Sequence, residues 1–281
     1  MVPVMCRLFG ILSISPSNAA EYLLNDPCSL YAQSKSDPLR LQGDGWGLGF
    51  YIGESLKVAR SEKPIFEEYL RFKSIVEGIK SNIIVAHIRR ASNPRGLPKE
   101  KLISIENTQP FSYKNYVFAH NGVISMPDEV AQLLGDWKLN IRGLNDSEVY
   151  FWYIVKELSE GKSIADALKN FQRDLLTVWM ENREKYPERK RPYIGLNMVF
   201  SDGKNLYAYC KYDEYLDGGF RSLCYGDQPA MQMAYVASPE KLVVASEKTN
   251  VRENWQPLRS GQLLTGSMVD RRVEVVIQTL E

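Results

Sequence analysis

The sequence of 281 residues predicts an α+β fold in which two mainly antiparallel sheets are covered by helices. Strand-like apolar runs occupy much of the first 124 residues, two amphipathic helices follow, and the chain then returns to strand-like segments. Strands and helices that are grouped, rather than alternating, are typical of layered α+β folds. Because no repeat and no linker rich in Pro, Gly or Ser divides the sequence, we expect residues 6–281 to form a single domain.

The strands of the first half are short apolar runs. Residues 6–14 (CRLFGILSI) form a continuous apolar run of a length typical of a fully buried strand. Two further segments flank Gly53-Glu54 and are expected to pair across that turn. Residues 67–80 predict a helix because Leu70, Ile75, Val76 and Ile79 are apolar. The strands expected here are residues 6–14, 45–52, 56–60, 83–88 and 116–124.

Two helices are expected in the middle of the chain. The first covers residues 146–160 and is preceded by a capping signal, Asn-Asp-Ser-Glu, which begins at Asn145. The second covers residues 163–183, and its apolar side chains fall on one helical face. That face consists of Ile164, Leu168, Phe171, Leu175 and Trp179.

The second half of the chain is again rich in strand-like segments. Residues 194–200 and 205–210 flank Ser201-Asp202-Gly203-Lys204, which is a good hairpin turn. The remaining expected strands are residues 231–237, 242–246, 262–266 and 273–277.

The composition argues against several classes of partner. The net charge is +1, so there is no electrostatic case for binding nucleic acid or an anionic membrane. No apolar run approaches the roughly 20 residues of a membrane span. The basic run at residues 183–191 also contains acidic residues and is expected to be a solvated loop. A secretory leader in residues 1–20 is an alternative, but Arg7 interrupts its apolar stretch.

The four cysteines are far apart and form no CxxC pair, which argues against a structural zinc site and a dense disulfide framework. We expect a reducing, cytoplasmic setting, with Cys28, Cys210 and Cys224 packed as small buried hydrophobic residues. No metal and no cofactor is expected.

Polar clusters follow two of the expected core strands, and each contains one of the two histidines. An Asn-Gly pair at a strand end, here Asn121-Gly122, offers a side-chain amide and an unhindered N–H, the parts of an oxyanion hole; a plain turn is the alternative. Arg89 could be half of a structural ion pair or could bind a substrate carboxylate. Asp146 could cap the following helix or bind a ligand.

Taken together, four motifs resemble the class II glutamine amidotransferases, which have the N-terminal-nucleophile hydrolase fold. The first motif and residues 43–51 (GDGWGLGFY) are similar to the stand-alone branch of predicted amidotransferases and γ-glutamyl hydrolases. The resemblance covers at least residues 6–265 and implies a four-layer αββα sandwich. The motifs are Cys6-Arg7-Leu8-Phe9-Gly10, His87-Ile88-Arg89, His120-Asn121-Gly122 and Asn145-Asp146-Ser147-Glu148.

The resemblance implies hydrolysis of a γ-glutamyl amide through a γ-glutamyl thioester. Cys6 would supply the thiolate, with its own α-amino group as base and then acid. The other roles implied are the oxyanion hole (Asn121, Gly122), the α-carboxylate site (Arg89), the α-ammonium site (Asp146) and further substrate contacts (Ser92, His120).

Two features depart from the family pattern. Gln109 stands where the family commonly has His, and we expect this position to support the structure. Cys6 is preceded by five residues, so residues 1–5 are expected to be a leader or a mis-assigned start. With them attached, the Cys6 nitrogen is an amide and cannot act as a base.

Two functions are alternatives to a free-standing γ-glutamyl hydrolase. One is a glutaminase subunit that passes ammonia to a separate synthase, and the other is an inactive binding or regulatory homologue.

Overall fold

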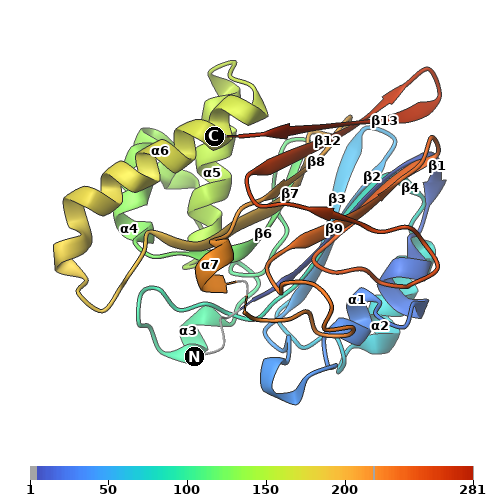
Figure 1. The fold of residues 1–281 in the computed structure, drawn as a ribbon, viewed down its shortest axis with the longest axis horizontal. Helices are drawn as coiled ribbons and strands as arrows, with labels where there is room; N and C mark the ends of the chain where they lie inside the picture. Colours follow the sequence, from blue (N-terminus) through green and yellow to red (C-terminus); the bar gives the residue numbers. More distant parts are fainter. Residues whose placement is uncertain (1–4, 218, 281) are drawn as a thin grey trace.

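The computed structural model describes residues 5–217 and 219–280 and contains four layers: helices, two facing sheets and helices again (Figure 1). All strand pairs in the two sheets are antiparallel. In spatial order, the first sheet consists of β11 (Gln256–Leu258), β9 (Met233–Ala237), β10 (Lys241–Ala245), β1 (Arg7–Ser17), β4 (Ser81–Ile88), β2 (Trp46–Ile52) and β3 (Ser55–Ser61). The second consists of β13 (Arg272–Thr279), β12 (Gln262–Val269), β8 (Leu206–Cys210), β7 (Tyr193–Ser201), β6 (Tyr116–Ile124) and β5 (Phe111–Tyr113).

Helices cover the outer face of each sheet. The second sheet packs against α4 (Pro127–Val130), α5 (Asp146–Ser159) and α6 (Ile164–Asn182). The first sheet packs against η1 (Glu21–Asn25), α1 (Leu30–Gln33) and α2 (Tyr69–Gly78). The connections carry η2 (Pro38–Arg40), α3 (Lys99–Leu102), η3 (Ala131–Asn140), η4 (Arg183–Lys185) and α7 (Glu214–Asp217).

Alternation of side chains along β1 shows how one strand serves two cores. Leu8 and Leu12 point into the core between the sheets. Phe9 and Ile11 point the other way, into the core beneath the helices of the first sheet. Successive side chains of a strand point to opposite faces, so a strand that is buried on both faces is apolar throughout. This explains the continuous apolar run in the sequence.

Glycines on the inner face of the first sheet allow the second sheet to approach closely. A Cβ on Gly47 would lie 2.3 Å from the carbonyl oxygen of Gln109, and one on Gly49 would lie 2.5 Å from Val117. A Cβ on Gly10 would lie 2.7 Å from Val199. These positions therefore require glycine for packing rather than for a special backbone angle.

The fold class and the two-sheet architecture are confirmed, and every strand and helix expected from the sequence is present. β6 begins and ends at the expected residues. The sequence reasoning missed β5 and β11, each of three residues, because so short a strand carries almost no periodicity. None of the described helices is both long and apolar enough to span a bilayer.

The expectation for two of the cysteines was wrong. Cys28 and Cys224 form a disulfide, with Cα atoms 5.8 Å apart, although their positions in the sequence differ by 196. The spacing of the cysteines could not show this pairing because it depends on the fold, which brings the segment between α7 and β9 against the residues that precede α1. Cys210 is a buried thiol, as expected.

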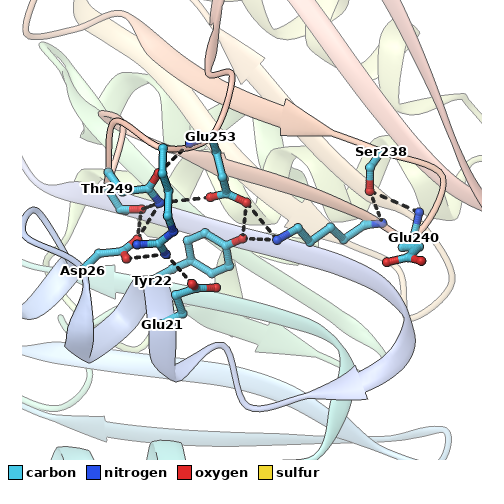
Figure 2. A network of polar contacts seen from close by, with 10 residues as sticks. Glu21, Tyr22, Asp26, Ser238, Glu240, Thr249 and Glu253 are labelled. Carbon is cyan, nitrogen blue, oxygen red and sulfur yellow. Dashed lines mark hydrogen bonds and ion pairs between the residues drawn. The ribbon is translucent and has the colours of Figure 1, made fainter.

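A polar network anchors η1 to the loop that follows β10 (Figure 2). Tyr22 and Lys241 both hydrogen-bond Glu253, each at 2.9 Å. Asp26 accepts hydrogen bonds from Thr249 at 2.5 Å and from Arg252 at 2.7 Å. Because these charged groups neutralise one another, we interpret the network as a structural link between η1 and this loop.

Candidate active site

Cys6 lies immediately before β1, and its thiol is buried. The register pairs Arg7 with Ile88 of β4, so the residues that follow β4 lie next to Cys6. Its Sγ is 3.3 Å from the carbonyl oxygen of Arg90, to which the thiol donates, and 3.4 Å from the Arg90 nitrogen, which donates to it. The sequence places a thiol at a strand end, and strand pairing brings the Arg89-Arg90 segment to it.

Burial raises the pKa of the Cys6 thiol to about 11. The Arg90 amide and the charge of Arg89 oppose this rise, whereas Asp146 and Asp44 add to it. The thiol is therefore protonated at neutral pH, and attack on a carbonyl requires a base. In the chain as described, the nitrogen of Cys6 is bonded to Met5, which is buried in the core between the sheets.

Arg89 is a buried cation held by backbone oxygens. Its Nη1 donates to the carbonyl oxygens of Leu102 at 2.7 Å and Asp44 at 3.3 Å. Burial lowers the pKa of Arg89, and the charges of Asp44 and Asp146 oppose this. These hydrogen bonds go to neutral carbonyl oxygens and not to a carboxylate. The positive charge of the guanidinium therefore remains available to an anionic ligand.

Asp146 is the first residue of α5 and does not cap that helix. The cap is Asn145, whose Oδ1 accepts from the Ser147 nitrogen at 2.9 Å. The Asp146 carboxylate instead points toward β6 and the loop after β4. It accepts from the Ile124 nitrogen at 2.7 Å and from the Ser92 hydroxyl at 2.9 Å. Asp146 and Ser92, two of the site residues expected from the sequence, are thus in direct contact.

Asn121 points into the space between the sheets. Its neighbours at the same phase of β6, Val117 and Ala119, belong to the inter-sheet core. The Asn121 side chain is buried, and neither polar atom has a hydrogen-bond partner among the described residues. A buried, unpartnered amide is costly unless a ligand completes it.

Gly122 lies at a β-bulge between β6 and β7. The pairing register shifts between Gly122 and Val123, opposite Gly195. A Cβ on Gly122 would lie 2.1 Å from the Gly195 carbonyl oxygen, so only glycine fits. Bulges often occur next to active sites, where they change the direction of the backbone.

The ring of His120 lies on the opposite face of β6 from Asn121, so the expected substrate contact is not supported by the geometry. Its Nδ1 is 2.9 Å from the hydroxyl of Ser147, and its Nε2 is 3.3 Å from the carbonyl oxygen of Gly195. The ring is buried against α5 and packs edge-on against Tyr150. The reason is the strand period of two, which sends the side chains of consecutive residues to opposite faces.

Sequence reasoning missed Asp44 as a site residue. Its carboxylate accepts from the Ala91 nitrogen at 2.8 Å, and its own nitrogen donates to the Arg89 carbonyl at 3.0 Å. Asp44 thereby holds the segment that carries Arg89 and Ser92. The signal was the Gly-Asp-Gly triplet before β2, in which a polar residue lies between two glycines.

His87 is a second buried group near the site. It lies on the inner face of β4, paired with Leu8 of β1 and Gly47 of β2. Its ring nitrogens have no hydrogen-bond partner within the described ranges. Burial lowers the pKa of His87 to about 3, and the charge of Arg89 acts in the same direction. His87 is therefore a neutral imidazole at physiological pH.

A cavity of about 570 Å³ adjoins the residues after Ser92 and Gly122. Two arginines form part of its wall and are anchored by the protein: Arg95 donates to Asp128, and Arg189 stacks on Tyr186. Arg189 belongs to the basic run that was expected to be a solvated loop; its side chain is largely covered, although most of that run is exposed. The other lining residues are Asn93, Pro94, Gly96, Val123, Ser125 and Glu188.

Comparisons with known proteins identify the family. The family model of class II glutamine amidotransferases matches residues 5–278. An uncharacterized protein of Methanocaldococcus jannaschii is 31% identical over 212 residues, 74% of this chain and 51% of that protein. The γ-glutamyl-hercynylcysteine sulfoxide hydrolase of Mycobacterium tuberculosis is 32% identical over 124 residues, 43% of this chain and 50% of that protein. The matched regions span about half the length of these two relatives.

Among solved structures, a glutamine aminotransferase class-II domain protein from Silicibacter pomeroyi has the same fold. The TM-score is 0.63 at 17% sequence identity, over 98% of this chain and 100% of that one.

Proposed function

The chain belongs to the class II glutamine amidotransferases, a family that hydrolyses the amide of glutamine, and we propose that Cys6 is its nucleophile. In this proposal residues 1–5 are removed, and residues 6–281 act as one catalytic domain. The substrate is glutamine or a γ-glutamyl compound, and the products are glutamate and ammonia or an amine.

The observation that carries the proposal is the position of the Cys6 sulfur. It contacts the backbone of Arg90, and the charges of Arg89 and Asp146 both act on it. A thiol close to a cation and a carboxylate suits an amino-acid substrate, because its α-carboxylate and α-ammonium can each meet the opposite charge. Ser92, which hydrogen-bonds Asp146, completes this head-group site.

The proposed chemistry uses the amino group that removal of residues 1–5 would expose. This amine takes the proton of the Cys6 thiol, and the sulfur attacks the side-chain carbonyl carbon of the substrate. Asn121 Nδ2 and the Gly122 N–H bind the oxyanion. The protonated amine then gives its proton to the leaving amine as the C–N bond breaks. Water hydrolyses the γ-glutamyl thioester and restores the thiol.

The experiment compares two forms of the protein, one beginning at Met1 and one beginning at Cys6, each verified by intact mass. We expect the Cys6 form to release glutamate from glutamine or from one member of a panel of γ-glutamyl amides. The Met1 form should be at least ~10²-fold slower, because an amide nitrogen cannot act as the base. Cys6→Ala should abolish activity. Cys210→Ala, which alters the other buried thiol, should retain it.

If a folded protein that begins at Cys6 hydrolyses none of these amides, the hydrolase proposal is wrong and the inactive-homologue alternative is favoured. A protein that is slow alone but accelerates with a co-purifying synthase would identify the ammonia-delivering subunit instead. The M. tuberculosis relative is named for a γ-glutamyl sulfoxide substrate, so a γ-glutamyl compound that carries a sulfoxide is a reasonable member of the panel.

A cytoplasmic location is also a proposal. The expectation of a reducing compartment treated Cys28 and Cys224 as free thiols. Their disulfide does not support it, because disulfides are rare in such compartments. Titration of thiols in denatured protein from its own cells tests the point. Four thiols would support a reducing compartment, whereas two would show that the disulfide persists there.

A further inference from the structure

Gln109 connects β6 to the start of α5 through two hydrogen bonds. Its Oε1 accepts from the backbone nitrogen of His120 at 2.6 Å. Its Nε2 donates to the hydroxyl of Ser147 at 3.2 Å. The same hydroxyl is 2.9 Å from Nδ1 of His120, whose Nε2 is 3.3 Å from the carbonyl oxygen of Gly195. All four residues are buried.

The donors and acceptors in this series of hydrogen bonds follow from the two backbone groups that it includes, the His120 N–H and the Gly195 carbonyl. A backbone N–H only donates, so the oxygen of the Gln109 amide faces His120 and the NH₂ group faces Ser147. The Ser147 oxygen therefore accepts from Gln109. The Gly195 carbonyl can only accept, so Nε2 of His120 carries the proton that is donated to it. In a neutral imidazole Nδ1 is then unprotonated and accepts the proton of the Ser147 hydroxyl.

We propose that Gln109 holds His120 in the neutral Nε2–H tautomer, and that His120 in turn is a positioning residue for the oxyanion strand. This inference rests on the proposed function for its catalytic consequence, but not for the tautomer itself. The chain ends at the Gly195 carbonyl, the oxygen that leaves room only for glycine at position 122. It passes through Ser147, the residue after Asp146. The series of hydrogen bonds therefore fixes the position of the proposed oxyanion donors, Asn121 and Gly122, relative to the Asp146 carboxylate.

The surroundings of His120 favour the neutral state. Burial lowers the pKa of His120, the charge of Asp146 and the Gly195 carbonyl oppose this, and burial is the largest influence. Tyr150 from α5 packs against the ring, and the neutral His87 of β4 is also close to it. A protonated ring would put a hydrogen on Nδ1, which conflicts with the proton that Ser147 donates there. Gln109 does not titrate, so the donors and acceptors in this series of hydrogen bonds should not change across the physiological pH range.

The direct test is the nitrogen NMR spectrum of protein labelled with ¹⁵N-histidine. The chain has only two histidines, so two imidazole spin systems are expected, and a His87→Gln variant assigns them. We expect His120 to show a protonated Nε2 and an unprotonated Nδ1 from pH 6 to 8. A proton on Nδ1 in this range would overturn the proposal. Because the spectrum needs no substrate, failure of the hydrolase assay leaves this result interpretable.

Variants at position 109 connect the tautomer to catalysis. Gln109→Glu keeps the shape but removes the donor, so Ser147 should turn its proton toward the new carboxylate and His120 Nδ1 should become protonated. We expect kcat to fall at least ~10-fold, the scale of a lost positioning hydrogen bond. Gln109→His can restore both bonds when neutral, so its activity should approach the wild-type value at high pH and fall on acidification.

The exposed Gln132→Glu is the matched control and should change neither the spectrum nor the pH profile. If Gln109→Glu folds and leaves the His120 tautomer unchanged, Gln109 does not select it and the proposal is wrong. If that variant does not fold, the spectrum of the wild-type protein and the pH profile of Gln109→His decide the question.

Discussion

Burial decides the protonation state of the polar side chains nearest the candidate site. The Cys6 thiol and the His87 ring are both buried, and burial disfavours the charged form of each: the thiol keeps its proton and the imidazole stays unprotonated. At the level of single residues, the site in the described chain is therefore a neutral thiol and a neutral ring beside the cation of Arg89. A base from elsewhere must activate the sulfur.

The buried His87 has a consequence for acid stability. Its pKa is about 3 in the folded chain, against 6.5 for a histidine exposed to water, so between these pH values the unfolded state binds more protons. Stability contributed by this neutral ring is complete above pH 6.5 and is lost as the pH falls toward 3. We expect His87→Gln to weaken the pH dependence of the unfolding free energy by up to about 1.4 kcal/mol per pH unit in that window.

Urea unfolding at several pH values measures this effect. The difference at pH 8 gives the loss of packing in the variant, and the change in slope below pH 6.5 isolates the titration. Equal slopes in the two proteins would show that His87 is not neutral in the folded state.

At the level of elements, strand β2 shows why two sheets can meet so closely. Its residues alternate between large side chains that face the helices, such as Trp46 and Leu48, and glycines that face the second sheet. The gap left at Gly47 is filled by the Gln109-Pro110 segment. β2 therefore packs directly against Gln109, whose side chain hydrogen-bonds both β6 and α5. A change in the packing of this strand should therefore affect the candidate site.

Gly47→Ala should therefore destabilise the protein, although alanine usually favours a folded chain. The new methyl group would meet the backbone of Gln109 at 2.3 Å, and overpacking of this kind costs about 1–3 kcal/mol. Gly78→Ala is the matched control because nothing lies within 4 Å of its added Cβ. It should be neutral or stabilising by up to about 1 kcal/mol. Urea midpoints measure both, and equal effects of the two substitutions would contradict the packing argument.

At the level of the whole molecule, the loop around Cys224 links the helical layer of the first sheet to the oxyanion side of the second. Glu247 accepts from the backbone nitrogens of Leu223 at 3.0 Å and Cys224 at 3.1 Å. Further along, the Met231 carbonyl accepts from Asn197 at 2.6 Å, and Asn197 pairs with Asn121. The disulfide to Cys28 thus anchors a segment that extends to the neighbour of the candidate oxyanion strand.

Loss of this disulfide should be costly because it closes a loop of nearly two hundred residues. Chain-entropy arguments and measured cases give about 2–5 kcal/mol for such a cross-link. We expect a reductant to lower the urea midpoint of the wild-type protein and to leave that of a Cys28→Ala/Cys224→Ala double variant unchanged. No change in the wild-type protein on complete reduction would show that the link contributes nothing to stability.

The layers, the strands and the motif residues of the candidate site could be predicted from the sequence, because they depend on periodicity and on short motifs that lie within a few residues of one another. The opposite orientations of His120 and Asn121 follow from the strand period of two, which the sequence also contained. The pairing of Cys28 with Cys224 and the bonds of Gln109 could not be predicted, because each depends on which residues from distant parts of the chain meet. Such contacts are determined by sheet pairing and packing between layers, which a local pattern does not contain.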